Sequence, residues 1–447
     1  MFDALGKLPF MKSKSVGIEI APDRVNVAQL HRKGQAFQLT ELATAEIPEE
    51  IFQEGQILDA SAMAEIIQSI LTEKKIKCKV AATAISGGGN IVTRIISVPA
   101  ELDDRELREM VLNQEAGLYL PFPREEADIN YQKLDLFVDE DGIEKVQVLL
   151  AAARKEATDS YLETFQQAGL SISTIEVSEF SLIRTIREQL RQLTPRKAAA
   201  LVDIGFESTE ISVVIDGIPH FSRSIPIGTF QIQSAVNRAM NLPLSRNTDL
   251  LQGMTVPTIP RDAVGSPQST AGDAFDPGAA VMLRSLEQLS DELSRSINFY
   301  LNQGEDRAVD QLFLAGPGAT IGQLDKFFTQ RLGLLCSRVN PIETLGLEVS
   351  DEIPLTRPSN WGIVLGLAYK PLRRPDLNIN FLENQSEHRL ARTRHTQGRK
   401  RLSTPLSKDV ASLADLDPWT QSLIGVIQLD TEEPMESYVD HLEEKYR

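Results

Sequence analysis

The sequence has few cysteines, few histidines and no long apolar run, and each shortage excludes a class of protein. Cys78 and Cys336 stand far apart, so they provide neither a disulfide framework nor a metal-binding spacing. The 5 histidines form no His-Glu-x-x-His pattern of the kind that binds zinc. No run of about 18 apolar residues is present, which argues against a transmembrane helix. Lys7 and Pro9 interrupt the apolar start, so no signal peptide is expected.

Positive charge is also in short supply. The 46 lysines and arginines are outnumbered by 63 aspartates and glutamates, which gives a net charge of −17. An acidic surface repels phosphate backbones, so we expect no nucleic-acid partner. The 447 residues, 42% of them hydrophobic, are enough for about two to three domain-sized units. These features together predict a globular protein of the cytoplasm.

Strand and helix patterns alternate along the first half of the chain. A Pro-Asp turn divides Val16–Leu30 into two β-rich runs, which predicts a hairpin. Residues 86–153 read as strand, helix, strand and strand, which indicates a small inserted subdomain. Its helix begins with a capping pattern, Asp103 followed by Glu106, and stops at Tyr119-Leu-Pro-Phe-Pro123. Helices are further expected at Ser61–Lys74, Lys155–Ala168 and Ser181–Leu193, and buried strands at Val80–Ile85 and Leu170–Val177.

The second half repeats this start. We expect strands in Ala198–Ile215 and Ile218–Ile225, a strand at Leu312–Leu314, and helices at Pro277–Asn302, Leu324–Leu332 and Trp361–Ala368. Residues rich in Pro, Ser, Thr and Gly predict a mobile insertion at about 255–278. The predicted domains are a flexible start at 1–13, a first lobe at 14–197, a second lobe at 198–383, and a mostly disordered tail at 384–447.

An internal repeat links the two halves. Gly17-Ile-Glu-Ile-Ala21 aligns with Leu201-Val-Asp-Ile-Gly205, so that Glu19 falls on Asp203 and Ile20 on Ile204. The turn after such an acid presents backbone N–H groups to phosphate oxygens, and the acid can hold Mg²⁺ through water. Two such hairpins facing one cleft would clamp a triphosphate. Gly316 and Gly318, after a buried strand, would let the backbone approach an adenosine closely.

These features, in this order, resemble the actin-like ATPase superfamily and, within it, the family of the type IV pilus assembly protein PilM, a relative of the cell-division protein FtsA. The resemblance covers about residues 14–383, and the Tyr119–Pro123 segment after an acidic helix is its most PilM-like piece. It implies an α/β fold of two duplicated, ribonuclease H-like lobes with a small inserted subdomain. It also implies ATP and Mg²⁺ as ligands. The residues implied for them are Glu19, Arg24, Asp203, Gly205, Ser208, Thr209, Gly316 and Gly318, with Asp203 and Glu19 facing the metal.

The first phosphate loop departs from the family pattern of Asp-Ile-Gly and small hydroxyl residues. Glu19 replaces the aspartate and Ala21 the glycine, and Pro22 has no N–H to donate. Asp23 would repel a phosphate, whereas Arg24 offers a compensating cation. We therefore expect ATP binding without metabolic enzyme activity, and whether ATP is hydrolysed stays open.

The resemblance also implies a partner. A PilM-type scaffold would dock the N-terminal cytoplasmic segment of PilN, a single-pass membrane protein, beside the inserted subdomain and link it to the pilus motor and other inner-membrane components. An extended peptide gains specificity there from alternate side-chain pockets. Membrane contact would then be made only through partners, and homo-oligomerisation stays open. The candidate partner-binding residues are Arg94, Leu107, Met110, Val111, Tyr119 and Phe122, although a plain core is the more usual place for the apolar ones.

Two other functions remain as alternatives. A small-molecule kinase of the same superfamily needs a carboxylate as catalytic base; Glu179 is the only suggestive acid, and we expect it instead to cap the helix at Ser181 or lie on its surface. An FtsA-like, membrane-associated filament protein would end in a basic amphipathic helix, whereas this tail ends acidic. The apolar segment Trp419–Leu429 could bind a partner, dock on the protein itself or have no specific role.

Overall fold

The computed structural model describes residues 14–87, 89–193, 197–256, 277–302, 308–353, 356–372 and 377–383. The expected flexible start, most of the insertion near 255–278, and the tail with Trp419–Leu429 lie outside these residues. Across the ranges given, no helix combines the length and the apolar character needed to cross a membrane.

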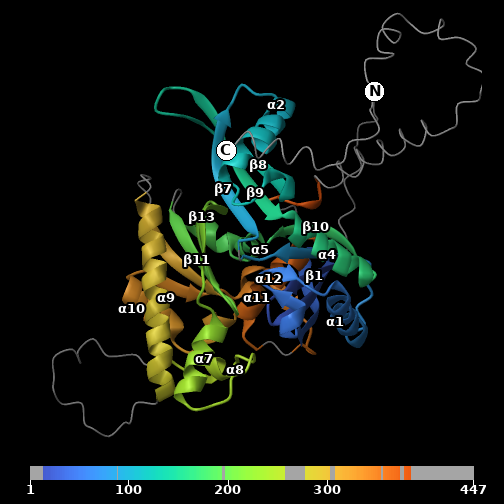
Figure 1. The fold of residues 1–447 in the computed structure, drawn as a ribbon, viewed down its shortest axis with the longest axis vertical. Coiled ribbons are helices and arrows are strands. Elements are labelled where there is room, and N and C mark those ends of the chain that lie inside the picture. Colours follow the sequence, from blue (N-terminus) through green and yellow to red (C-terminus); the bar gives the residue numbers. More distant parts are fainter. Residues whose placement is uncertain are drawn as a thin grey trace, which may run out of the picture. The chain divides into compact units, whose positions relative to one another are not determined.

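Two sheets with the same topology form the core of the fold (Figure 1). In each, an antiparallel hairpin is extended by a third strand on one side and by two parallel strands on the other, in the orders β10-β6-β1-β2-β3 and β13-β12-β11-β14-β15. The first sheet has a sixth strand, β16 (Leu347–Val349), beside β3. This repeated arrangement confirms the expected pair of ribonuclease H-like lobes. The first sheet contains β1 (Lys14–Ile20), β2 (Arg24–Lys33), β3 (Ala36–Glu46), β6 (Val80–Ile85) and β10 (Ser171–Val177), and the second contains β11 (Ala198–Ile204), β12 (Thr209–Ile215), β13 (Ile218–Ile225), β14 (Val309–Ala315) and β15 (Leu335–Arg338).

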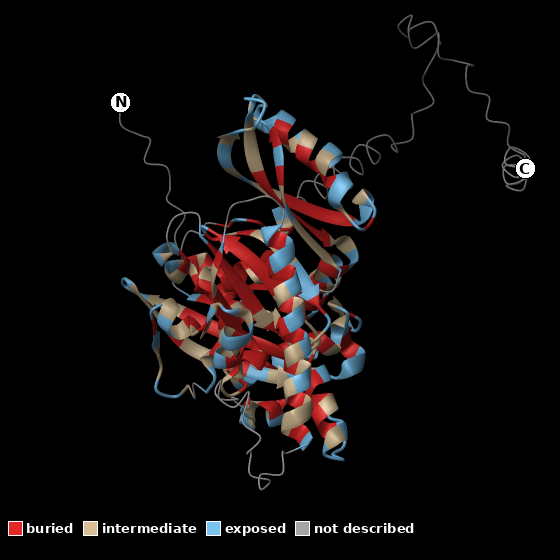
Figure 2. Ribbon diagram, turned by 90° about the vertical axis from the view of Figure 1, so that its left-hand side faces the viewer, coloured by how far each residue is buried: buried red, intermediate tan, exposed pale blue. Residues whose placement is uncertain are grey.

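Amphipathic helices cover these sheets. Helix α1 (Ala60–Glu73) begins where the side chain of Asp59 accepts a hydrogen bond from the amide of Ala62 at 2.9 Å, and it packs beside α4 (Lys155–Gln167). Helix α9 (Pro277–Leu301) packs against α7 (Thr229–Ala239) and buries one apolar stripe. Figure 2 shows buried residues concentrated in the strands, with the exposed ones on the outer faces of the helices. The sequence pattern therefore placed α1, α4 and α9 correctly, whereas α7 was not expected from the sequence.

After β15 the chain returns to the first lobe. Strand β16 (Leu347–Val349) pairs in parallel with β3, and α12 (Gly362–Tyr369) packs between β1 and α5 (Ser178–Thr185). A Cβ on Gly17 would lie only 2.5 Å from the carbonyl oxygen of Val364, so this contact requires glycine. The predicted second lobe at 198–383 is therefore wrong in its last part. The apolar composition of α12 indicates burial, but it does not indicate which sheet the helix covers.

The inserted subdomain has the predicted order of strand, helix, strand and strand, and its own hydrophobic cluster. The capping box at Asp103 and Glu106 is present, and the amide of Glu106 donates to Oδ1 of Asp103 at 2.8 Å. The expected single helix is instead interrupted by a π-helical turn at Met110–Glu115. The subdomain comprises β7 (Ile91–Pro99), α2 (Asp104–Glu109), α3 (Ala116–Tyr119), β8 (Ala127–Val138) and β9 (Glu144–Arg154).

Some short elements differ from the sequence prediction. The helix expected at Ser181–Leu193 is two helices, α5 and α6 (Arg187–Gln192), because Ile186 leaves the helical conformation between them. The other elements are β4 (Phe52–Gln53), β5 (Gln56–Ile57), α8 (Asp249–Gly253), α10 (Leu324–Leu332) and α11 (Pro341–Thr344).

Candidate functional site

Both hairpin turns open onto one cleft with a volume of about 520 Å³. The first lobe contributes Glu19 and the turn at 21–24, and the second lobe contributes Asp203 and the turn at 205–208. Gly316 and the segment 359–363 also line the cleft. The structure thus brings the repeated motifs together across a single cavity.

The two hairpins are equivalent in register. Glu19 lies opposite Asn26 in the first, and Asp203 lies opposite Glu210 in the second, each one position before the last paired residue. Nδ2 of Asn26 donates a hydrogen bond to Oε2 of Glu19 at 3.2 Å. The sequence alignment of Glu19 with Asp203 is therefore confirmed. The second hairpin has Glu210 where the first has Asn26. It therefore pairs two acids, Asp203 and Glu210, whereas the first hairpin pairs Glu19 with an amide.

The second turn has the features of an anion site. The amide of Gly205 donates to the carbonyl of Ser208 at 2.9 Å and closes the turn. The next three amides, of Phe206, Glu207 and Ser208, have no hydrogen-bond partner among the residues that the structure describes. All three residues line the cleft. Successive free N–H groups of this kind form a concavity that binds phosphate oxygens.

The first turn offers less to a phosphate. The amide of Ala21 is already bonded to the carbonyl of Arg24 at 2.9 Å, and Pro22 has no N–H. The Arg24 guanidinium forms an ion pair with the buried Asp23 at 2.5 Å. A phosphate would therefore have to compete with Asp23 for Arg24.

Arg246 connects the two lobes at the edge of this turn. Its Nη2 donates to the carbonyl of Pro22 at 2.8 Å, and its Nη1 lies 3.5 Å from Oε2 of Glu49. Its guanidinium carbon also lies 5.1 Å from the centre of the Phe206 ring, within cation–π range. Sequence reasoning missed this role, because a single arginine in the 241–248 loop has no local pattern.

The glycines after β14 allow a close approach of two backbones. Gly316 has a φ of 80°, and a Cβ there would overlap Oδ1 of Asp203. Its amide donates to the carbonyl of Ser359 at 3.1 Å. A Cβ on Gly318 would overlap the side chain of Ile204, so Gly318 packs behind the cleft and does not line it.

Six of the eight residues implied for the nucleotide line the cleft, and two do not. Besides Gly318, Thr209 is fully buried, and its hydroxyl donates to the carbonyl of Ile227 at 2.6 Å. Thr209 thereby holds the segment before α7 in place. The six that line the cleft are Glu19, Arg24, Asp203, Gly205, Ser208 and Gly316.

Carboxyl groups dominate the charge of the cleft. Burial raises the pKa of Glu19 to about 8, against the hydrogen bond from Asn26, and Asp203 adds to the rise. Burial raises the pKa of Asp203 to about 7, with a further contribution from Glu210. Burial also raises the pKa of Glu210, although the hydroxyls of Ser208 and Ser224 donate to it. In the described part of the chain, no three acidic, histidine or cysteine side chains are grouped to hold a metal alone.

Glu179 is neither a helix cap nor a free surface residue, so that expectation was wrong. It lies in the first turn of α5, where it accepts a hydrogen bond at 2.7 Å from the hydroxyl of Ser222 on β13 of the other lobe. Burial raises the pKa of Glu179 to about 7, against hydrogen bonds from Ser212 and Ser222. Glu210 adds to the rise. Sequence could not show this contact because the partner strand lies in the other lobe.

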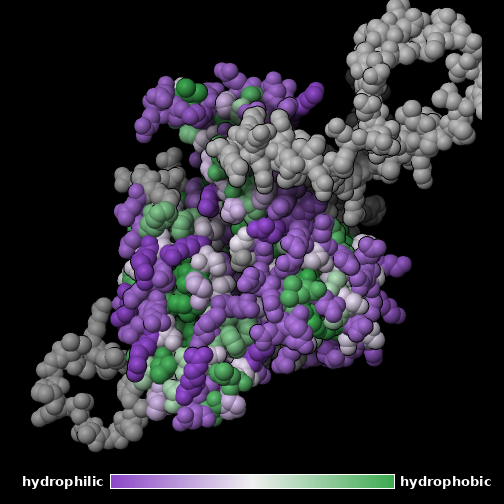
Figure 3. All heavy atoms as spheres, in the orientation of Figure 1, coloured by the Kyte–Doolittle hydropathy of each residue, from purple (hydrophilic) through white to green (hydrophobic). Residues whose placement is uncertain are grey.

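The partner-binding candidates separate into core and surface. Leu107, Val111 and Phe122 are at most 6% exposed and fill the subdomain core, so their prediction as a contact surface was wrong. Met110 is partly buried, whereas Arg94 and Tyr119 are exposed. Figure 3 shows a mainly hydrophilic outer surface on the subdomain, with separate hydrophobic residues. The exposed apolar residues of the subdomain are Leu118, Tyr119, Leu136, Val138 and Ile143.

Comparisons with known proteins find one family and several solved structures that are similar to this chain. A family model described as "Type IV pilus assembly protein PilM" matches residues 17–249 and 279–371. The solved structure of a "PilM-PilN type IV pilus biogenesis complex" matches with 24% identity and a TM-score of 0.67, over 81% of this chain and 99% of that one. The ethanolamine utilization protein EutJ from Carboxydothermus hydrogenoformans matches at 12% identity and a TM-score of 0.44, over 80% and 90% of the two chains. MreB5 of Spiroplasma citri bound to ADP matches at 11% and 0.42, over 80% and 95%.

The family match includes both hairpins, the inserted subdomain and the return of the chain to the first lobe. It therefore spans the whole arrangement that forms the cleft. The chain belongs to the family of the type IV pilus assembly protein PilM.

Proposed function

We propose that this chain is a nucleotide-binding scaffold of type IV pilus assembly that docks the N-terminal cytoplasmic segment of PilN at the inner face of the plasma membrane. The family match, which includes the inserted subdomain, carries this proposal. The similar solved structure is a complex with PilN, which supports the same partner for this chain. The protein would reach the membrane through PilN and other inner-membrane components of the pilus machinery.

The second turn, at 205–208, and Gly316 after β14 support ATP as the ligand. Residues 206–208, whose amides have no partner among the described residues, line the cleft, and its volume of about 520 Å³ lies within the range of about 300–1,000 Å³ typical of small-molecule sites. Gly316 allows the backbone to approach a nucleoside closely. The phosphates would therefore lie against the second hairpin.

The acidic side chains support Mg²⁺ as the companion of the nucleotide. Burial raises the pKa values of Glu19 and Asp203, and a free triphosphate would add negative charge beside these carboxyls. Bound Mg²⁺ would supply positive charge between the phosphates and these carboxyls, usually through water. Binding should consequently depend strongly on the divalent cation.

Ligand binding would favour a closed arrangement of the lobes. The Arg246 contacts with Pro22 and Glu49 already bridge the cleft at one edge. A ligand that contacts both hairpins shifts such an equilibrium only by its differential affinity for the two states. Couplings of about 1–3 kcal/mol are typical, so we expect nucleotide to change PilN affinity within the corresponding range.

The test has two titrations of the full chain. The first uses fluorescent ATP with Mg²⁺ and with EDTA; we expect binding in the micromolar range, on the order of −8 kcal/mol, that requires Mg²⁺ and is lost in Asp203→Ala. Glu65→Ala, which changes an exposed acid on α1, is the matched control. The second uses a labelled N-terminal PilN peptide with and without nucleotide. Absence of PilN binding in both states would refute the scaffold role.

A further inference from the structure

The last described segment, residues 377–383, packs against the first lobe, with 377–380 outside regular secondary structure and a turn that begins at Phe381. Leu377, Ile379 and Phe381 are 6%, 0% and 1% exposed, whereas Asn378 between them is exposed. This period of two is the pattern of a strand with one face against a core. Only residues 373–376 connect the segment to the preceding element.

One wall of its groove is the open edge of the first sheet. Strand β10 is the terminal strand of that sheet, so the outer N–H and C=O groups of the strand are free for another segment. The amide of Phe381 donates to the carbonyl of Ile175 at 2.9 Å. The side chain of Asn380 accepts from the amide of Ile175 at 3.0 Å and donates to the carbonyl of Ser173 at 3.3 Å. One asparagine therefore replaces two backbone partners.

The inserted subdomain forms the opposite wall. Nδ2 of Asn130, on β8, donates to the carbonyl of Asn380 at 2.7 Å. Oε1 of Gln132, on the same strand, accepts from the amide of Asn378 at 2.7 Å. The segment is thus held between β10 and β8, beside the inserted subdomain, where the partner peptide is also proposed to dock.

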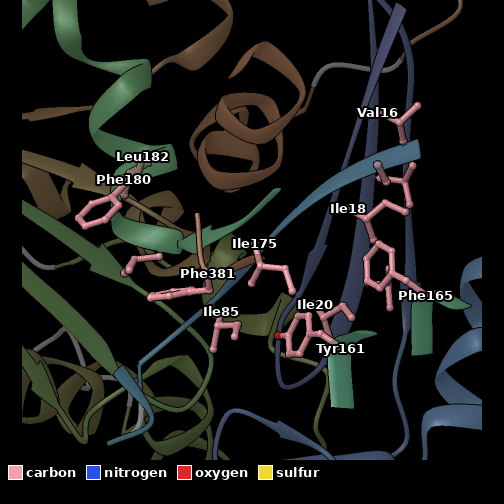
Figure 4. Packing of buried hydrophobic residues seen from close by; sticks show 14 of the residues in the cluster. Val16, Ile18, Ile20, Ile85, Tyr161, Phe165, Ile175, Phe180, Leu182 and Phe381 are labelled. Atoms are coloured by element: carbon pink, nitrogen blue, oxygen red, sulfur yellow. The ribbon is translucent and has the colours of Figure 1, made fainter. Parts of the chain in front are cut away.

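The floor of the groove consists of apolar side chains and a buried cation. Figure 4 shows the Phe381 ring beside Ile85 and Ile175, below Phe180. Nζ of Lys370 donates to the carbonyl of Ile379 at 3.1 Å and also binds the buried Glu176 at 2.6 Å. These contacts bind backbone groups, one asparagine and apolar side chains, so they would hold a separate peptide in the same way.

We propose that residues 377–383 are a built-in ligand of the partner groove, which a partner peptide must displace. The competing peptide would carry the same chemistry: an extended segment with an asparagine between an aliphatic and an aromatic or aliphatic residue, both buried. This inference rests on the proposed docking of PilN beside the subdomain. Because the connection is short, the effective concentration of the segment is on the order of millimolar, which makes it a strong competitor.

The first experiment measures binding of a fluorescein-labelled peptide with the sequence of residues 377–383 to the full chain by fluorescence anisotropy. Asn380→Ala in the protein removes the three side-chain hydrogen bonds of that residue, including the one it accepts from the amide of Leu382. Asn378→Ala is the matched control because its side chain is exposed. We expect Asn380→Ala to bind the peptide at least about tenfold more tightly than wild type or the control. Equal affinity in all three proteins, or no binding to Asn380→Ala, would overturn the proposal.

Thermal unfolding of each protein accompanies the titration. A loss of peptide binding through misfolding would appear as a lost transition, and Gln132→Ala then provides a second variant that weakens the segment from the opposite wall. A peptide in which the central asparagine is alanine should bind at least about tenfold more weakly than the parent peptide, as expected when one asparagine supplies several hydrogen bonds.

A second probe, the N-terminal PilN peptide, separates this inference from the proposed function. Tighter PilN binding to Asn380→Ala than to wild type supports both. Equal PilN binding to all proteins leaves the PilN role intact and refutes displacement. Binding of the 377–383 peptide without any PilN binding would keep the groove as a peptide site and refute PilN as its partner.

Discussion

Replacing Asp203 by asparagine should change the pH dependence of stability. Burial raises the pKa of Asp203 from its ordinary value of 3.8 to about 7, so the folded protein disfavours the charged form. The unfolded chain ionises first as the pH rises. Stability from this residue is therefore fully present below about pH 4 and is lost as the pH rises through about 7. The amide side chain in the variant Asp203→Asn would be neutral throughout, so the variant should gain on wild type with increasing pH.

The size of the effect follows from the pKa. The full shift spans about three pH units, and at about 1.36 kcal/mol per unit it corresponds to about 4 kcal/mol. Water in the cleft screens the charge, so we expect about 1–2 kcal/mol in total. About half of it should appear between about pH 5.5 and pH 8. The variant's melting temperature should then rise relative to wild type by about 2 °C over this range, measured by calorimetry without nucleotide.

A control variant and one outcome test this prediction for Asp203→Asn. Glu65→Gln changes an exposed carboxylate on α1 and should track wild type at both pH values. A constant difference between Asp203→Asn and wild type at low and high pH would mean that Asp203 is not held in a disfavoured charged state. The description of an acidic cleft that needs a cation would then fail.

Three other substitutions test the cleft and the core. Arg246→Ala should remove the bridge between the lobes and speed hydrogen exchange at residues 20–25, with a stability loss of about 1 kcal/mol. The control Arg238→Ala changes an exposed residue on α7 and should leave this exchange unchanged. Equal exchange in both variants would contradict the bridge. Gly316→Ala should lower the free energy of unfolding by more than about 1 kcal/mol in denaturant titrations. Strain at the positive φ of this position adds to the overlap of the new Cβ with Asp203. Gly333 also has a positive φ, but a Cβ there would meet nothing within 4 Å, so Gly333→Ala should destabilise the protein less. A larger loss in Gly333→Ala than in Gly316→Ala would contradict the close approach of Gly316 to Asp203. Glu176→Gln should cost about 3–5 kcal/mol, since the buried Lys370 and the partly buried Arg184 lose their anion. A loss below about 1 kcal/mol would show that the ion cluster is dispensable.

The sequence by itself determined the features that depend on local order. The hairpins around Glu19 and Asp203, the capping box at Asp103 and the strand–helix order of the subdomain follow from turn residues and apolar spacing within about ten to fifteen residues. The repeat established the equivalence of the two acids, because a two-fold duplicated fold places equivalent positions on facing hairpins. The glycine at 316 could be identified because its position after a buried strand is itself a local signal.

Tertiary structure alone decided which surfaces meet. Apolar spacing indicated that Leu107 and α12 are buried, but hydrophobic attraction has no direction and does not specify the partner. The same pattern therefore fitted a partner surface or a core for Leu107, and either lobe for α12. The hydrogen bond from Arg246 to Pro22 and the contact of Asn380 with Ile175 each join groups more than 200 residues apart in the chain. Such contacts leave no periodic trace in the sequence, because they depend on how the two lobes and the subdomain are packed.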